Sequence, residues 1–128
     1  MLGHIIRVLE SATGDLAVEF ASEVGQATAR WDGLPPEEGA SYEAEIDVPG
    51  VLAWGTDIVR SSPGKPAIAG GPEALELVGE VEMVSPDGYT IVRVGKCMAR
   101  FRAQGRAFPI GSWVRLRARD ALLCEQGL

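Results

Sequence analysis

The stretch Trp113–Asp120, "WVRLRARD", decides how the rest of the chain is interpreted. Successive side chains of a β-strand point to opposite faces. The stretch therefore predicts a strand that carries Trp113, Arg115, Arg117 and Arg119 on one face and small or apolar side chains on the other. Such a row of arginines can grip phosphates, dock on an acidic partner, or be neutralised by carboxylates of the neighbouring strand.

The same alternation recurs along the chain, whereas helical periodicity is nearly absent, so the pattern predicts an all-β protein. We expect five strands in each half, and loops too short for crossover helices make each half an antiparallel meander. The expected strands cover 4–11, 16–22, 26–31, 41–48 and 51–59, and then 76–85, 89–95, 96–103, 112–119 and 121–126.

The two halves are separated by a stretch rich in Pro, Gly and Ser, "RSSPGKPAIAGGP". This composition predicts a linker at 61–72, between a first domain at 1–60 and a second at 73–128. An offset of 72 to 73 residues aligns Arg30 with Arg102, Gly33 with Gly105, and Gly39 with Gly111. The offset indicates a tandem repeat. Domains of about 60 residues are marginal alone, so we expect the halves to share an interface.

Each half has an apolar first strand, a tight hairpin, a glycine-containing loop before the fourth strand and a short last strand. In this order of features each half resembles the OB-fold. The resemblance implies two tandem five-stranded antiparallel barrels, in each of which strand 4 lies against strand 1. An SH3-like barrel, or one sandwich made from all ten strands, fits the same pattern of strands.

The charge is distributed unevenly between the halves. The chain has a net charge of −6, which disfavours nonspecific attraction to nucleic acid or to an anionic membrane. Residues 1–64 hold three basic and 11 acidic residues, a net charge of −8, whereas the remainder holds nine basic and seven acidic residues, a net charge of +2. The two halves therefore differ in sign.

This difference extends to single positions on the expected strands. The fourth strand of the first half carries Glu43, Glu45 and Asp47 where the second half carries its arginines, and Arg7 stands where the second half has Glu80. Because opposite charges on adjacent strands stabilise a sheet, the swap favours pairing within each half. Glu80 and Glu82 would then lie beside Arg115 and Arg117. Two other interpretations stay open: the acidic row of one half docks on the basic row of the other, or the basic face is exposed and binds something else.

Single-stranded nucleic acid is the ligand that an exposed basic face with aromatic residues would suit, since guanidinium groups contact phosphates and aromatic rings stack on bases. Phe101 falls on the face opposite its neighbouring arginines and is expected in the core, and Trp113 either stacks or packs under a loop. The candidate ligand-binding residues are Tyr89, Arg93, Arg100, Arg102, Trp113, Arg115, Arg117 and Arg119.

Catalysis is not indicated by the sequence. The only histidine, His4, lies near the start of the first strand and is expected at the surface. Asp32, Glu37 and Glu38 lack the spacing of a calcium loop and indicate a solvated loop. Cys97 and Cys124 have no metal or redox spacing, so we expect two reduced, partly buried thiols, with a bridge between them as the minority alternative. No catalytic residue, metal or cofactor is predicted.

The stretch "DVPGVLAWGTDIV" has two apolar faces, which predicts a strand buried on both sides. Trp54 then lies either at a seam between the halves or subunits, or in an ordinary core. Together the observations predict a non-catalytic binding or adaptor module in the cytoplasm, with a protein partner or self-association and no membrane contact. Single-stranded nucleic-acid binding by the second repeat is the alternative function.

Overall fold

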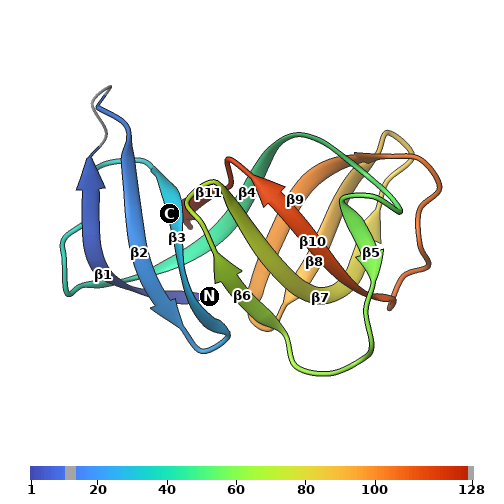
Figure 1. Ribbon diagram of the computed structural model, residues 1–128, viewed down its shortest axis with the longest axis horizontal. Helices are drawn as coiled ribbons and strands as arrows, with labels where there is room; N and C mark the ends of the chain where they lie inside the picture. Colours follow the sequence, from blue (N-terminus) through green and yellow to red (C-terminus); the bar gives the residue numbers. More distant parts are fainter. Residues whose placement is uncertain (11–13, 127–128) are drawn as a thin grey trace.

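The computed structural model describes residues 1–10 and 14–126, and the described part is all-β (Figure 1). The prediction of an all-β fold is thus confirmed. Its strands belong to a single mixed sheet of 11 strands. They are β1 (Leu2–Glu10), β2 (Leu16–Ser22), β3 (Gly25–Asp32), β4 (Ser41–Ala53), β5 (Ile58–Arg60), β6 (Ala67–Gly70), β7 (Ala74–Val84), β8 (Tyr89–Val94), β9 (Cys97–Gln104), β10 (Trp113–Arg119) and β11 (Leu122–Glu125). The predicted turn at 12–15 falls partly outside the described residues.

The first half of the chain forms a closed cycle of paired strands. β1 pairs with β2, β2 with β3, and β1 also pairs with β4. The gap between β3 and β4 is filled by β11, which runs parallel to β3 and antiparallel to β4. The strand that completes the first cycle therefore comes from the far end of the described chain.

The second half shows the reverse arrangement. Its strands pair in the order β9-β8-β7-β10. β10, the fourth strand of this half, thus lies against β7, the first, as the resemblance to the OB-fold implied. The end of β4 pairs in parallel with β9, and β5 pairs with β10. A bridge between Trp54 and Ile58 joins these two pieces. In Figure 1, β4 crosses from the group of β1, β2 and β3 to the group of β7 to β10.

The predicted antiparallel meander within each half is thus wrong in its last strand. The segment 51–59, expected as strand 5 of the first half, pairs with β9 and β10, and β11 pairs with β3 and β4. The two exchanges create two parallel pairings, β4 with β9 and β11 with β3. Short loops exclude parallel pairing between consecutive strands, but they do not exclude it between strands of different halves.

One local expectation is also corrected. The turn expected between the strands at 41–48 and 51–59 lies inside β4, where the pairing with β9 shifts register between Asp47 and Val51. Pro49 has no N–H to donate, and Gly50 has a φ of 81°, so this bulge accommodates both residues without ending the strand. The predicted linker contains β6, which pairs with β7, and the N–H of Ile68 in β6 donates to the carbonyl of Val24 before β3.

A continuous hydrophobic core extends through both halves. Its fully buried side chains include Phe20 and Ile46 from the first half and Leu77 and Leu116 from the second. Phe101 is buried, as predicted. The prediction that 51–59 is buried on both faces is wrong, because Val51 is 54% exposed while Leu52 is buried. This segment joins the halves through backbone pairing along its edges and not through side chains on both faces.

Candidate functional site

The arginine row of β10 is exposed along its whole length. The inward side chains Val114, Leu116 and Ala118 are completely buried, so the three arginines point to the outer face. Directly opposite them on β7 lie Val78, Glu76 and Ala74. Among residues 1–10 and 14–126, none of the three arginines has a carboxylate within 4.0 Å.

The predicted neutralisation by Glu80 and Glu82 is wrong in register. On the β10 side, Glu80 lies opposite Trp113 and not opposite an arginine. On the β8 side it lies opposite Arg93, with its carboxylate 3.8 Å from that guanidinium. Glu82 falls in the register shift between β7 and β8, beyond the end of the pairing with β10. The bulge at this point adds a residue that the alternation of side chains does not reveal.

The corresponding pairing in the first half is wrong as well. β1 pairs with β4 only as far as His4 and Ser41, so Arg7 does not reach the acidic residues of β4. It lies opposite Glu19 of β2 instead. His4 is exposed, as predicted, with its Nδ1 3.2 Å from the hydroxyl of Ser41.

The other candidate arginines form a second group, on β8 and β9. Each of the three has a carboxylate partner: Arg93 has Glu80 at 3.8 Å, Arg100 has Asp47 at 2.7 Å, and Arg102 has Asp87 at 3.1 Å. Tyr89 lies opposite Arg102 and, with Arg100 and Arg102, lines a hollow of about 440 Å³. The structure thus divides the predicted site into an unpaired row on β10 and a paired group around Tyr89.

The pair between Arg102 and Asp87 is reinforced within its turn. The Ser85 hydroxyl donates to the Asp87 carboxylate, and this bond, followed by the contact with Arg102, lowers the carboxyl pKa to about 2. The backbone N–H of Tyr89 also donates to the same carboxylate. Asp87 therefore stays ionised over the physiological range and continues to neutralise Arg102.

Asp47 has two partners, one on each neighbouring strand. On β9, the Nε of Arg100 donates to its carboxylate; burial alone would lower the guanidinium pKa, but the charge and hydrogen bond of Asp47 outweigh burial and raise it. On β11, the Sγ of Cys124 lies 3.5 Å from the other carboxylate oxygen. The acidic strand of the first half thus contacts a basic strand of the second, but this strand is β9 and not β10.

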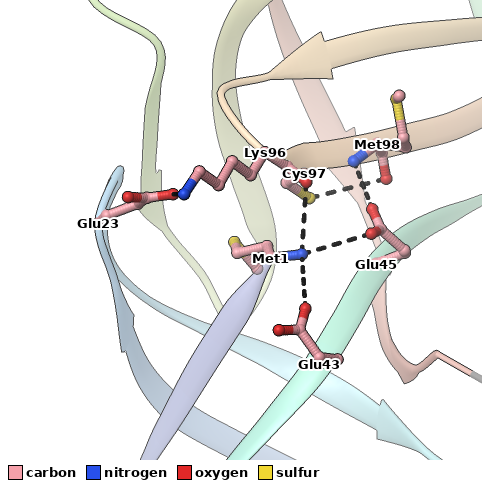
Figure 2. Close-up of polar contacts among 7 residues, drawn as sticks. All are labelled: Met1, Glu23, Glu43, Glu45, Lys96, Cys97 and Met98. Carbon is pink, nitrogen blue, oxygen red and sulfur yellow. Dashed lines mark hydrogen bonds and ion pairs between the residues drawn. The ribbon is translucent and has the colours of Figure 1, made fainter.

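Glu45, two residues earlier on β4, is buried against the same region of β9 (Figure 2). Its carboxylate accepts a hydrogen bond from the backbone N–H of Met98, and it lies 3.4 Å from the amino group of Met1. The more exposed Glu43 also contacts this amino group, at 3.3 Å. Glu45 therefore has a structural role where β4 and β9 meet.

The two cysteines are free and buried, in agreement with the prediction of two reduced thiols. Burial, and then the nearby charge of Glu45, raise the pKa of Cys97 to about 12. Burial, and then the nearby charge of Asp47, raise the pKa of Cys124 to about 12 as well. Because the thiolate is the reactive form, neither thiol is a nucleophile at neutral pH.

A further hollow brings together residues that the sequence analysis did not combine. It has a volume of about 480 Å³, and its lining includes Trp54, Arg60, Arg106 and Phe108. Trp54 and Arg60 belong to the segment that crosses over from the first half, which explains why the residue order did not place them beside the loop after β9. The signal in the sequence was the loop "QGRAFPIG", where a basic and an aromatic residue stand close together.

No protein-family model matches the chain, and no curated protein or solved structure is similar to it. The described residues contain no helix long and apolar enough to cross a bilayer. They also contain no group of three or more His, Cys, Asp or Glu side chains arranged to hold a metal ion. The case for a function therefore depends on the two arginine groups and the hollow beside Phe108.

Proposed function

We propose that this protein is a non-catalytic, cytoplasmic binding module that uses the β10 row, Arg115, Arg117 and Arg119, to dock an acidic segment of a partner protein. The observation that carries the proposal is the exposure of these three guanidinium groups without an ion pair in the described part of the chain. A row that served only to stabilise the sheet would be paired with carboxylates.

The spacing of the row suits an extended peptide. Alternate residues on a strand are about 6.7 Å apart, and this is also the spacing of alternate side chains in an extended partner segment. Val59 and Val78 lie opposite Arg115 and add apolar surface beside the row. Glu73 and Asp120 line a hollow with Arg117 and Arg119 at the end of the row, and Glu76 of β7 lies opposite Arg117. An acidic segment in register with the row carries several carboxylates, and it would therefore outcompete the single carboxylate of Glu76 for the guanidinium of Arg117.

Single-stranded nucleic acid, bound by the basic face of the second repeat, is the alternative ligand, and part of that face is the group around Tyr89. There the guanidinium groups of Arg93, Arg100 and Arg102 already have carboxylate partners, which lie where phosphates would have to bind. Counterion release, the main source of such affinity, is thereby reduced. This pairing favours the acidic-segment function.

The two cycles of strands are, in this proposal, two OB-like barrels repeated in tandem, each completed by the last strand of the other. In both halves the loop before strand 4 contains two glycines of positive φ, Gly33 and Gly39 in the first and Gly105 and Gly111 in the second. A scaffold completed in this way would hold β10 rigidly, and a rigid, preformed row loses little entropy on binding.

The experiment is a fluorescence anisotropy titration of the full chain with a labelled, acetylated peptide of alternating Glu and Ser. We expect a dissociation constant below about 100 μM at low salt that weakens as salt is added, since exposed charge pairs are screened. Arg117→Glu should weaken binding about tenfold or more, because it replaces attraction with repulsion at the centre of the row.

Arg7→Glu is the matched control, because Arg7 is also an exposed arginine but lies on β1. Equal loss of affinity in the two variants would refute docking on β10. Tighter binding of a labelled oligothymidylate than of the peptide, weakened by Tyr89→Ala, would replace the proposal with the nucleic-acid alternative.

A further inference from the structure

The hollow beside Phe108 differs in chemical character from the other four hollows described for this chain. Its lining consists of Trp54, Arg60, Arg106, Ala107, Phe108 and Pro109, with no carboxylate among them. Each of the other four hollows described for this chain is lined by at least one Asp or Glu. The hollow is therefore basic and partly aromatic in a protein that is acidic overall.

The aromatic side chains form a fixed wall. The rings of Trp54 and Phe108 meet edge to face, with centroids 5.1 Å apart, and both are half-buried against the core. Gly105, whose φ of 95° favours glycine, lies against this wall, since a Cβ built on it would be in ordinary contact with the Cβ of Trp54 at 3.8 Å. Aromatic rings held in this way can stack on a planar ligand without losing much conformational freedom.

Arg60 is positioned by the same wall. Its guanidinium carbon lies 4.7 Å from the centroid of the Phe108 ring, a cation–π contact. A guanidinium packed on a ring keeps N–H groups at its edge for a bidentate oxyanion. Within residues 1–10 and 14–126, neither Arg60 nor Arg106 has a carboxylate within 4.0 Å, and the indole N–H of Trp54 has no acceptor.

We propose that this hollow is a binding site for a small phosphate monoester carried on an aromatic ring, with Arg60 and Arg106 as ligands of the phosphate, Trp54 as the stacking surface, and Phe108, whose ring Arg60 covers, as the support of Arg60. Two unpaired guanidinium groups suit a phosphate monoester, whose charge at pH 7 is about −1.5 to −2, better than they suit a single carboxylate. The volume lies within the range of about 300–1,000 Å³ that small-molecule sites occupy. This site is separate from the β10 row and does not depend on its function.

The test is an NMR titration of the full chain that follows the Trp54 indole signal and the backbone amides of Arg60 and Arg106. The probes are adenosine 5′-monophosphate and phenyl phosphate, which carry the same group on different rings, with adenosine and inorganic phosphate as the separate parts. We expect both probes to shift these signals, and each separate part to bind at least about tenfold more weakly, because it uses only half of the site.

Arg60→Gln and Arg106→Gln should each weaken binding about fivefold or more, since each removes one charged phosphate ligand. Arg7→Gln, on β1 and outside the hollow, is the matched control and should leave the affinity unchanged. A difference between the two probes identifies the preferred ring. The proposal is overturned if millimolar probe leaves the Trp54 indole unshifted, if inorganic phosphate binds as tightly as the monoesters, or if the control weakens binding as much as the two pocket variants do.

Discussion

β9 and β10 carry the same alternation of arginines with small or apolar residues, yet their arginines have opposite surroundings. On β9, Arg100 and Arg102 each have a carboxylate partner, at 2.7 and 3.1 Å. On β10, the three arginines of the row have no ion pair in the part of the chain that the structure describes. Arg100 has its partner on the acidic strand β4, which lies beside β9, and Arg102 has its partner in the turn before β8, whereas β10 lies between β7 and the short β5.

The comparison distinguishes arginines that stabilise the fold from arginines that are available to bind a ligand. Charges that are paired across strands contribute to folding, and charges that face solvent without a partner contribute little to it and remain available for a ligand. We therefore expect substitutions between β4 and β9 to reduce the free energy of unfolding, and substitutions on β10 to leave it nearly unchanged while altering binding.

The largest effect should come from Glu45→Ala. This side chain is only 8% exposed and accepts a hydrogen bond from the N–H of Met98, so its removal leaves a donor of β9 without a partner. We expect a loss of about 1–3 kcal/mol in the free energy of unfolding, measured by urea denaturation. Glu43→Ala is the control, because that side chain is 63% exposed and should cost less than about 0.5 kcal/mol. Equal losses would mean that the buried bond is not what holds β4 against β9.

Two double-mutant cycles test the cross-strand contacts, and a smaller effect should appear in the first of them. Asp47→Asn with Arg100→Gln should give a coupling energy of about 0.5–1 kcal/mol, reduced from that of a buried pair because both side chains are part-exposed. Glu82→Lys with Arg117→Glu should give a coupling energy near zero, since Glu82 lies beyond the pairing of β7 with β10. A clear coupling between Glu82 and Arg117 would contradict this register of β7 against β10.

The smallest effect concerns the pKa of Asp87. Its value of about 2 lies below the ordinary 3.8, so the folded state favours the ionised form. The resulting stabilisation is present above about pH 4 and is lost as the pH falls toward 2. Ser85→Ala removes the main cause and should raise the pKa toward 3.8, followed by the carboxyl carbon shift in an NMR titration. A midpoint that stays near 2 in this variant would assign the shift to Arg102 instead.

The sequence predicted what local alternation can determine. The facing of Trp113, Phe101 and the β10 arginines follows from the period of two, and β10 lies against β7 as the resemblance implied. It did not predict which strand lies beside β4, because that pairing joins residues more than 50 positions apart and depends on the exchange of last strands. The bulge at Glu82 was also missed, because one inserted residue changes the register without breaking the apolar pattern.

For the same reason the sequence located only part of each site. The candidate residues joined Tyr89 and Arg115 on the basis of charge and ring content, whereas the structure places them in groups with different partners. The hollow beside Phe108 was missed because Arg60 stands on the other side of the expected linker from Phe108. The sequence indicated this hollow only through a basic and an aromatic residue that stand close together in one loop. The pairing of β5 with β10 is what brings Arg60 to that loop.

The place of β11 in the first cycle also sets an order of events during synthesis. β4 is complete at Ala53, but the strand that pairs with both β3 and β4 ends at Glu125. At about 5–20 residues per second, a ribosome needs roughly 4–14 s to add the intervening stretch. Throughout that interval β3 and β4 lack the strand that lies between them, and unpaired edges are where nascent chains associate with one another. The first half of a nascent chain therefore stays open to such association until the second half has been made.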